Sequence, residues 1–236
     1  MVGEKVAIVI PALNEEAAIH QLLAELPQDF AQWVIVVDNG STDATATVAQ
    51  KSGAIVTTEP MRGYGRACMK GFKMACSLGA EIVIFMDGDG SDDPTDLPMM
   101  LRPIGEGKAD FVIGSRVSEL AERGAVPAQA RLGNWLVSRM IRLLYGVRLH
   151  DIGSFRVVRC SLLETIDMRE MTYGWPVEML VKAAQAHYRI LELPIHYRHR
   201  SHGRSKVAAT MNGSIKAAYY MLSTTLRYTG ARRTHA

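Results

Sequence analysis

The sequence contains little cysteine and no long apolar run. Its three cysteines, Cys68, Cys76 and Cys160, form no CxxC pair and cannot all pair with one another. Neither a disulfide-stapled scaffold nor a sulfur-ligated metal site is therefore expected. No stretch approaches the roughly 18 apolar residues of a membrane-spanning helix, and the first residues lack the apolar core of a signal peptide. These absences favour a cytoplasmic protein, either soluble or peripheral on the cytoplasmic face of a membrane.

The sequence also lacks internal repeats, low-complexity segments and any linker rich in proline and glycine that would separate two domains. Its 236 residues are enough to bury a sizeable core. A hydrophobic content of 48% and a charged content of 22% exclude a disordered chain and a polytopic membrane protein. We therefore expect one domain over residues 1–236.

Acidic residues are absent from the C-terminal part of the chain. All 24 Asp and Glu residues, but only 19 of the 27 Lys and Arg residues, lie at or before Glu192, which gives that part a net charge of −5. The 44 residues after Glu192 carry +8, from Arg198, Arg200, Arg204, Lys206, Lys216, Arg227, Arg232 and Arg233. We therefore expect the C-terminal part of the protein to bind an anionic ligand or surface.

Apolar runs alternate with helical patterns along the chain. Strands are predicted at residues 6–10, 33–37, 54–58, 81–86, 110–113 and 188–197. Helices are predicted at residues 15–26, 41–52, 65–78, 95–105, 130–145, 176–187 and 207–228, with a loop over 118–129. This order indicates an α/β fold with a Rossmann-like, mostly parallel central sheet and helices on both faces. Ligands of such sheets bind beyond the carboxyl ends of the strands.

An acidic cluster follows the strand predicted at residues 81–86. Four aspartates fall within seven residues: Asp87, Asp89, Asp92 and Asp93. Such a concentration is tolerated chiefly when a cation neutralises it, and these oxygen ligands suit Mg²⁺ or Mn²⁺ bound to a phosphate. Helix capping is the alternative role for Ser41 and Asp96 at similar strand ends.

Two other ligand-binding motifs are rejected or weak. A calcium loop beginning at Asp87 needs glycine at its sixth position and an acid at its twelfth, where this chain has Asp92 and Pro98. The run Gly63-Tyr64-Gly65 has Cys68 in place of the third glycine of a dinucleotide fingerprint, so NAD binding is a weak alternative.

Several runs, taken together, resemble family 2 glycosyltransferases of the GT-A fold. They are VIPALNEE at 9–16, VVDNGSTD at 36–43, RGxG at 62–65, MDGDGSDDP at 86–94 and GSR at 114–116. The later DxxSFR at 151–156, the helix containing Glu178 and RxxGxSK at 200–206 resemble the branch of dolichol-phosphate mannosyltransferases and polyprenyl-phosphate glycosyltransferases. The resemblance implies a nucleotide-sugar half (1–116), an acceptor half (117–206) and a C-terminal amphipathic helix with a basic tail (207–236).

The resemblance also implies a donor site. The nucleotide-sugar would contact Pro11, Ala12, Glu15, Asp38, Asp43, Arg62, Gly63, Gly65, Asp87 and Gly88. Mg²⁺ or Mn²⁺ would be held by the DxD pair Asp87 and Asp89 together with Ser91, which stands where the mannosyltransferases usually carry Gln. The membrane helices that follow the catalytic domain in many relatives are absent from this sequence.

The acceptor side is predicted from the same resemblance. Phosphates would be surrounded by Arg116, Arg131, Arg156, Arg200, Ser205 and Lys206. A lipid-phosphate acceptor is already an oxyanion at pH 7 and needs cations, whereas a hydroxyl acceptor needs a carboxylate base. Asp151 and Glu178 are the candidate bases, and each is equally a candidate structural partner of Arg156 or Arg131. With Asp89 and Arg116 they complete the predicted catalytic set.

The resulting hypothesis is an inverting, metal-dependent transfer of a hexose from a UDP- or GDP-sugar to a polyprenyl phosphate. Transfer to a soluble hydroxyl acceptor and a non-catalytic nucleotide-binding protein are the alternatives. The last predicted helix either packs on the core or lies on an anionic membrane. No nucleic-acid module is recognised, and His196, His199 and His202 fit surface or phosphate contacts better than metal ligands. The donor base, the sugar and a homo-oligomeric state stay open.

Overall fold

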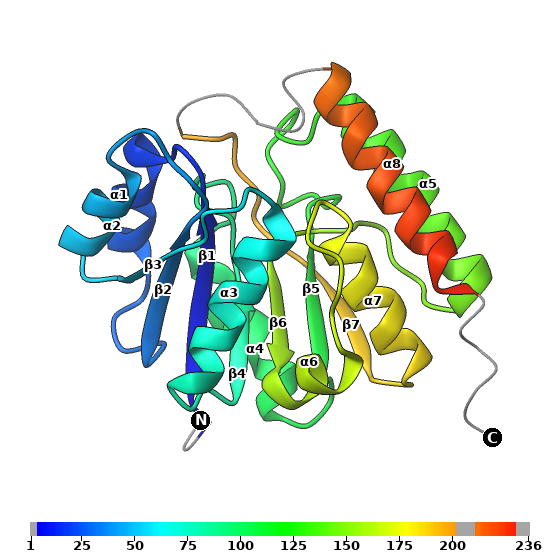
Figure 1. Cartoon of the computed structure of the whole chain (residues 1–236). Coiled ribbons are helices and arrows are strands. Elements are labelled where there is room, and N and C mark those ends of the chain that lie inside the picture. The colour runs from blue at the N-terminus through cyan, green and yellow to red at the C-terminus, as the bar shows by residue number, and fades with distance from the viewer. Residues whose placement is uncertain (1–3, 202–210, 230–236) are drawn as a thin grey trace.

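The computed structural model describes residues 4–201 and 211–229. Seven strands form one sheet in the order β3-β2-β1-β4-β6-β5-β7 (Figure 1). All neighbouring strands are parallel except at β6, which runs antiparallel to both β4 and β5. The strands are β1 (Val6–Ala12), β2 (Trp33–Asp38), β3 (Ile55–Thr58), β4 (Ile82–Phe85), β5 (Phe111–Ser115), β6 (Arg156–Arg159) and β7 (Ile190–Pro194).

Helices cover both faces of this sheet, as the sequence predicts. The helices are α1 (Glu16–Glu25), α2 (Thr45–Lys51), α3 (Tyr64–Ser77), α4 (Leu97–Gly105), preceded by a short 3₁₀ turn (Pro94–Asp96), α5 (Ala128–Tyr145), α6 (Cys160–Ile166), α7 (Trp175–Gln185) and α8 (Met211–Arg227). One apolar core lies between the sheet and α3, α5, α6 and α7, and a second lies between the sheet and α1, α2 and α4. The inner strands β1, β4 and β5 are buried on both sides, which explains their continuous apolar runs, whereas the edge strands β3 and β7 are partly exposed.

Strand β6 and helix α6 are the elements that the sequence pattern does not reveal. The strand is only four residues long and reads RVVR, so its two valines are flanked by charged side chains. Its first residue, Arg156, is nevertheless buried within the fold. A run this short and this charged carries no period that distinguishes it from a loop.

Helix α8 packs on the body of the protein. Met221 and Leu222 of α8 and Tyr228 just after it contact the first apolar core, and Thr224 and Thr225 are buried, whereas Leu226 is exposed. Ser205, Lys206 and His202 lie outside the described residues. Within residues 4–201 and 211–229, no helix combines the length and the hydropathy needed to cross a bilayer.

The parallel strands bring the predicted site residues to one edge of the sheet. Asp38 ends β2, Asp87 stands two residues beyond β4, and Arg116 directly follows β5. The segment after β7, residues 195–200, starts from this same edge and crosses it (Figure 1). We call this segment the strap.

Two glycines in helix interiors provide a test of how closely the helices pack. A Cβ at Gly71 of α3 would lie 2.3 Å from a methyl group of Val9, whereas a Cβ at Gly133 of α5 would meet nothing within 4 Å. Gly71→Ala is therefore expected to lower the free energy of unfolding by about 1 to 3 kcal/mol. Gly133→Ala, the control, is expected to raise it by about 0.5 to 1 kcal/mol through helix propensity. Urea unfolding of both variants measures this, and equal effects would contradict the close packing of α3 on β1.

Candidate functional site

The acidic cluster contains two carboxyl groups, the half-buried Asp87 and the buried Asp92, that form no ion pair with another described residue. The backbone N–H of Asp87 donates to Asp92 Oδ2 at 3.2 Å, and the hydroxyl of Tyr64 donates to Asp87 Oδ1 at 3.2 Å. Burial raises the pKa of Asp87 to about 6, and the nearby Asp89 carboxylate adds to the rise. Burial, followed by repulsion from Asp87 and Asp89, raises the pKa of Asp92 well above its ordinary value. The positive charge of Arg116 lowers both pKa values but does not offset burial and the repulsion between the carboxylates.

Oxygen atoms in the cluster are available to a cation. The hydroxyl of Ser91 and Oδ1 of Asp92 are buried and have no hydrogen-bond partner among the described residues. Within that same part of the chain, no three His, Cys, Asp or Glu side chains converge on one ion position. Mg²⁺ commonly takes only one or two carboxylates and completes its shell with phosphate and water. The donor set of Asp87, Asp89 and Ser91 therefore fits Mg²⁺ or Mn²⁺ held jointly with a phosphorylated ligand.

The strap supplies the cluster with positive charge from the other end of the sequence. Arg200 pairs with Asp89 at 2.5 Å and with Glu15 at 2.8 Å. Arg198 pairs with Asp93 at 2.5 Å, where Asp93 also accepts a capping hydrogen bond from the amide of Thr95. The guanidinium of Arg200 thus occupies one side of the DxD aspartate that is expected to bind the metal.

The strap also holds the predicted acceptor half. The backbone N–H of His199 donates to the Glu122 carboxylate at 2.7 Å, and the backbone of Tyr197 forms bridges to both Asp92 and Ala121. The strap therefore contacts both the acidic cluster, at the edge of the sheet where the donor is expected (the donor edge), and the loop over residues 117–127.

The expected nucleotide side lies across β1 and β2. Asp43 accepts from the amides of Thr45 at 3.0 Å and Glu16 at 3.2 Å, so it fixes the start of α2 against α1. Burial opposes the charge of Asp43, but hydrogen bonds from the Thr45 hydroxyl and from these two amides outweigh it and lower its pKa. Glu15 and Asp43 line a cavity of about 500 Å³. Asp38 ends β2 and accepts from the amide of Ser41 at 3.2 Å.

Loop residues next to the nucleotide side are fixed by an asparagine that the sequence analysis missed. The Asn39 amide donates to the carbonyls of Glu59 and Met61 at 3.0 and 2.9 Å, and its oxygen accepts from the amide of Gly63 at 2.8 Å. Its signal in the sequence is an amide residue directly after a strand, where a loop must be anchored. Arg62, in the same loop, donates to the carbonyl of Gly40 at 3.3 Å.

Gly63 and Gly65 are required by close backbone approach. A Cβ at Gly63 would lie 2.4 Å from the carbonyl oxygen of Met171, and one at Gly65 would lie 2.4 Å from that of Glu170. Pro11 and Ala12 form the end of β1, and a Cβ at Gly88 would lie 3.4 Å from the Pro11 carbonyl. The glycines let α3 start against the 170–171 segment, a reason independent of any nucleotide.

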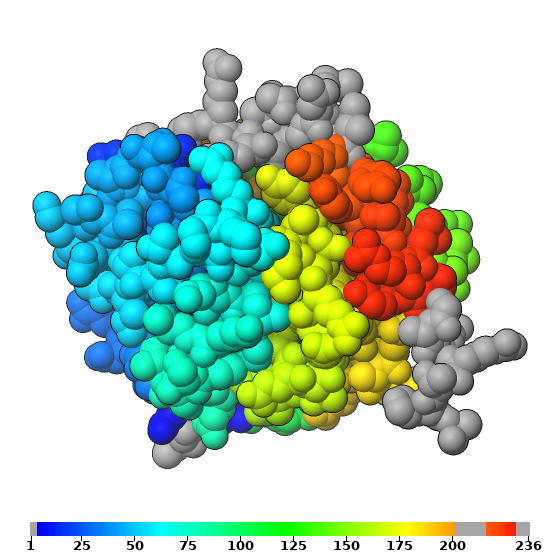
Figure 2. Space-filling model, in the orientation of Figure 1, coloured from blue at the N-terminus to red at the C-terminus, as the bar shows by residue number. Residues whose placement is uncertain are grey.

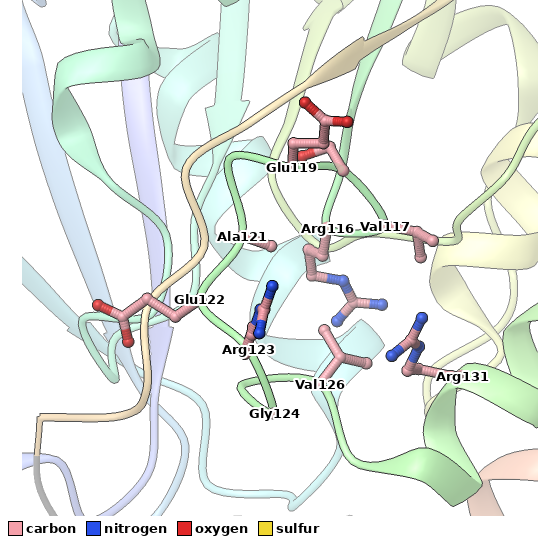
Figure 3. A pocket seen from close by; sticks show the side chains of 10 residues that line it. Arg116, Val117, Glu119, Ala121, Glu122, Arg123, Gly124, Val126 and Arg131 are labelled. Atoms are coloured by element: carbon pink, nitrogen blue, oxygen red, sulfur yellow. The ribbon is translucent and has the colours of Figure 1, made fainter.

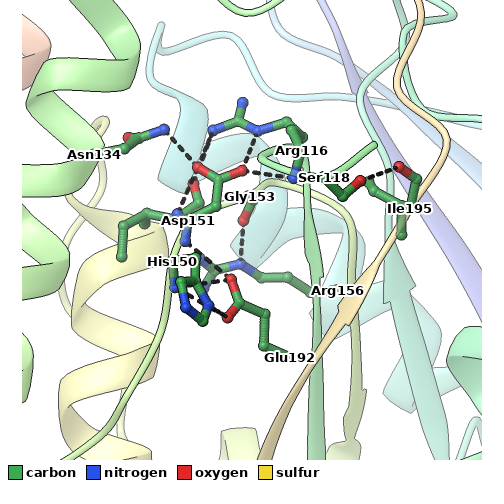
Figure 4. A network of polar contacts seen from close by, with 10 residues as sticks. Arg116, Ser118, Asn134, His150, Asp151, Gly153, Arg156, Glu192 and Ile195 are labelled. Atoms are coloured by element: carbon green, nitrogen blue, oxygen red, sulfur yellow. Dashed lines mark hydrogen bonds and ion pairs between the residues drawn. The ribbon is translucent and has the colours of Figure 1, made fainter. Parts of the chain in front are cut away.

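Arg116 and Asp151, both in the predicted catalytic set, form one buried ion pair (Figure 4). Arg116 donates to the two carboxylate oxygens from Nε at 2.7 Å and from Nη2 at 2.9 Å. Asp151 accepts further bonds from the amide groups of Asn134, at 2.5 Å, and Ile152, at 2.8 Å. Burial would raise the pKa of Asp151, but the Arg116 guanidinium outweighs it and holds that pKa below its ordinary value. Asp151 is thereby held ionised and fully hydrogen-bonded, which suits a positioning group better than a proton acceptor.

A pocket of about 660 Å³ lies beside this pair. Arg116, Arg123 and Arg131 turn their guanidinium groups toward a common space, with Val126 below them (Figure 3). The carboxylates of Glu119 and Glu122 point away from that space. The pocket therefore presents three guanidinium groups, of which Arg116 is also paired with Asp151, and fits a phosphate.

Arg156 and Glu178 are not brought to this pocket. Arg156 is buried, donates to the carbonyls of Gly153 and Pro176 at 2.7 and 2.6 Å, and lies 5.5 Å from the ring centre of Phe111. Burial lowers the pKa of its guanidinium to about 10. Its location fits an internal anchor of β6 rather than a phosphate contact.

Glu178 has a similar internal position. Its carboxylate accepts from the amides of Arg169 and Glu170 at 3.0 and 2.6 Å and from the Tyr228 hydroxyl at 2.5 Å. It also pairs with Lys182 at 2.9 Å. The partners of the two candidate bases are thus Arg116 for Asp151 and Lys182 for Glu178, not Arg156 or Arg131 as the sequence suggested.

Two residues of the pocket region were missed by sequence reasoning. Arg123 lies in the loop before α5, and its signal is that the chain has no acidic residue between Glu122 and Asp151. Tyr197 of the strap lies with its ring centre 5.4 Å from the Arg116 guanidinium. Nothing in its sequence neighbourhood distinguishes this tyrosine from a strand residue, because the contact joins segments far apart in the chain.

Comparison with known proteins gives a consistent result. The profile described as "Glycosyl transferase family 2" matches residues 7–167. The chain is 39% identical to an uncharacterised glycosyltransferase of Mycobacterium tuberculosis, over 92% of this chain and 96% of that one. It is 34% identical to a dolichyl-phosphate hexose transferase of Haloferax volcanii and 30% identical to an undecaprenyl-phosphate mannosyltransferase of Micrococcus luteus. Each of these two alignments covers 89% of this chain and 90% of the relative.

A solved structure confirms the predicted GT-A type fold. The chain resembles glucosyl-3-phosphoglycerate synthase of Mycobacterium tuberculosis, determined in complex with Mn²⁺, uridine diphosphate and glucosyl-3-phosphoglycerate. The TM-score is 0.74 at 22% identity, with 97% of this chain and 81% of that chain covered.

The pKa of Asp87 predicts a gain in stability when its charge is removed. A folded pKa of about 6, above roughly 3.9 in the unfolded chain, means that this group's contribution to stability is present at low pH and is lost as the pH rises through about 6. Asp87→Asn should raise the free energy of unfolding at pH 7.5 in EDTA by about 1 to 2 kcal/mol, and by almost nothing near pH 4. Urea unfolding at both pH values measures the difference.

The matched control is Asp110→Asn. Hydrogen bonding to Arg189 lowers the pKa of Asp110, so its stabilising contribution is present at pH 7.5 and is lost as the pH falls. This variant should be less stable than the original protein at pH 7.5. If Asp87→Asn lowered the free energy of unfolding at pH 7.5, the ionised Asp87 carboxylate would not destabilise the fold, and the prediction would be wrong.

The Arg200 contact predicts competition between a guanidinium and a metal ion. Because Arg200 occupies Asp89, Arg200→Gln should bind Mn²⁺ alone about three- to tenfold more tightly, a change of about 1 kcal/mol. The loss of the free Mn²⁺ signal in electron paramagnetic resonance titrations measures this affinity. Arg198→Gln is the control, because its partners are Asp93 and Glu25. Weaker Mn²⁺ binding by Arg200→Gln would refute the competition.

Proposed function

The chain belongs to glycosyl transferase family 2 and is a glycosyltransferase, and from this premise we propose that it moves a hexose from a nucleoside-diphosphate sugar to a polyprenyl phosphate with inversion at the anomeric carbon. The observation that carries this proposal is the pocket of Arg116, Arg123 and Arg131 beside the donor edge. Three guanidinium groups around one space are suited to a phosphate and offer nothing specific to a neutral hydroxyl.

The state of the acidic side chains supports a phosphate acceptor as well. A hydroxyl acceptor needs a carboxylate within reach to take its proton. Asp151 is committed to Arg116, and Glu178 is committed to backbone amides and Lys182. Glu119 and Glu122 turn away from the arginines (Figure 3). A phosphate monoester is already an oxyanion at pH 7 and requires no such base.

In the proposed reaction, a phosphate oxygen of the acceptor forms a bond to the anomeric carbon as the bond from that carbon to the donor diphosphate breaks. The nucleoside diphosphate leaves with the bonding electron pair, and no proton has to move. Arg116 positions the attacking phosphate, because two hydrogen bonds to Asp151 and a cation–π contact with the Tyr197 ring fix its guanidinium. Arg123 and Arg131 hold its other oxygens.

The donor and its metal are proposed for the adjoining edge. Asp87, Asp89 and Ser91 would hold Mg²⁺ or Mn²⁺, which, when bound, would stabilise the negative charge of the departing diphosphate. The synthase of similar fold was solved with Mn²⁺ and uridine diphosphate, and another of its structures contains Mg²⁺ with the same nucleotide. The base and ribose would lie along Pro11, Ala12, Glu15, Asp38, Asp43, Arg62, Gly63, Gly65 and Gly88.

A soluble phosphorylated acceptor is the second candidate. The synthase of similar fold was solved with glucosyl-3-phosphoglycerate, whereas two relatives of higher identity are named for polyprenyl or dolichyl phosphate. Both kinds of acceptor present an anion to the arginine pocket. An acceptor panel containing a short polyprenyl phosphate, phosphoglycerate and a neutral glycoside distinguishes them, and labelled sugar appearing only on a soluble compound would refute the lipid acceptor.

The arginine pocket predicts separate effects on donor and acceptor. Arg123→Gln and Arg131→Gln should each raise the KM for polyprenyl phosphate about tenfold or more, corresponding to one lost charge-assisted contact. The KM for the sugar nucleotide should change less than about twofold, because neither residue lies on the donor edge. Initial rates in detergent with a panel of UDP- and GDP-sugars measure both constants.

Two controls make this test decisive. Arg148→Gln removes an exposed arginine of the same acid-free stretch that does not line the pocket, and it should leave both constants unchanged. Asp89→Ala should abolish turnover if the enzyme uses the DxD site. Equal acceptor constants for Arg123→Gln, Arg131→Gln and Arg148→Gln would overturn the phosphate pocket.

A further inference from the structure

Helix α5 presents an apolar stripe to the outside of the molecule. Four of its side chains are strongly exposed: Leu132 at 67%, Trp135 at 59%, Leu136 at 42% and Leu143 at 77%. Their spacing of three, four and seven residues places them on one face of the helix. The opposite face, with Val137, Ile141 and Tyr145, is buried in the core. An exposed stripe of this kind on a well-packed helix indicates a binding surface.

No described element covers this stripe. The inner face of α5 packs on α7 and α8, and the Tyr145 hydroxyl donates to the Thr225 carbonyl of α8 at 2.6 Å. The two helices stand together at one side of the molecule (Figure 1), and atoms of α5 form the outer rim beyond α8 in Figure 2. The exposed side chains therefore lie on the periphery of the protein.

The stripe is accompanied by positive charge and by no negative charge. Arg139 lies within the stripe, Arg131 and Arg142 lie along its flank, and Arg148 follows the helix; all four are exposed. Between Glu122 and Asp151 the chain contains five arginines and no acidic residue. No carboxylate among the described residues pairs with these four side chains.

We propose that the exposed face of α5 docks on an anionic lipid bilayer. Leucine and tryptophan side chains at the level of the lipid headgroups, flanked by arginines that reach anionic phosphates, are the features of an interfacial helix. The alternative occupant, a second copy of this chain, would bring the arginines of two identical stripes together. Their mutual repulsion would oppose such a pairing.

The position of this face gives the docking a role in catalysis. Arg131 belongs both to α5 and to the arginine pocket, and Val117, itself 41% exposed, lines that pocket too. A bilayer against α5 would therefore lie beside the mouth of the pocket, where a lipid phosphate could enter without leaving the membrane. This role rests on the proposed function, whereas the docking itself is a separate claim that is measured without donor or acceptor.

The test is sedimentation of the full chain with vesicles. We expect binding to vesicles of 70% phosphatidylcholine and 30% phosphatidylglycerol, little binding to pure phosphatidylcholine, and weakening by salt. The double variant Trp135→Ala, Leu143→Ala should bind about tenfold more weakly or worse, because it removes the apolar area that would enter the bilayer. Arg139→Gln, Arg142→Gln should lose the preference for the anionic vesicles.

The matched control truncates exposed side chains of the neighbouring helix. Tyr219→Ala, Leu226→Ala on α8 removes groups that are 66% and 54% exposed and should leave vesicle binding unchanged. Circular dichroism and urea unfolding verify that all variants fold. Trp135 also reports directly, because brominated lipids should quench its fluorescence and Trp135→Phe should abolish that quenching.

Three outcomes would overturn the proposal: no binding to anionic vesicles, an equal loss of binding in the α8 control, or a concentration-dependent dimer that the α5 double variant abolishes. The detergent assay with a short polyprenyl phosphate keeps the two claims separate. Activity there with no vesicle binding would refute the docking alone, and vesicle binding with no transfer to polyprenyl phosphate would refute the proposed function alone.

Discussion

The site depends on the neutralisation of buried carboxylates at the carboxyl edge of the sheet. Parallel strands deliver acidic side chains to this edge, and burial makes their charges costly. The strap neutralises some of these charges, because Arg200 pairs with Asp89 and Glu15 and Arg198 pairs with Asp93. Asp87 and Asp92 are left with raised pKa values. Among the described residues, the unused oxygen atoms of Asp92 and Ser91 lie in the part of the cluster that no ion pair neutralises.

Much of the fold follows from local sequence patterns. Fully apolar strands separated by amphipathic helices predict a parallel sheet with two covered faces, and the structure confirms it. Polar clusters at strand ends predict the edge where the site lies. The RVVR strand, β6, is not predicted from the sequence because it is stabilised by pairing with β4 and β5 on either side. This tertiary contribution leaves no periodic pattern of apolar residues in the local sequence.

The details of the site follow less readily from sequence. Arginines and carboxylates can be recognised as site residues, but their pairing depends on which segments the sheet brings together. Asp151 lies 35 residues from its partner Arg116, and Asp89 lies 111 residues from Arg200. Arg156 has the same chemistry as Arg116, yet it is buried behind the sheet edge because it begins β6. Local sequence gives the chemical type of a residue, whereas the topology decides whether it faces a ligand.

Strand β6 has a geometric consequence for the reaction. It separates β4, whose following loop carries Asp87 and Asp89, from β5, which Arg116 directly follows. Neighbouring strands are spaced by about 4.8 Å, so this insertion holds the two loop origins about 10 Å apart. Because β6 runs antiparallel to its neighbours, it begins at this edge of the sheet and ends at the opposite edge. The loop that precedes β6 therefore lies at the site, whereas the segment that follows it does not. The antiparallel strand therefore sets the spacing between the loop that carries the acidic cluster and the loop that carries Arg116.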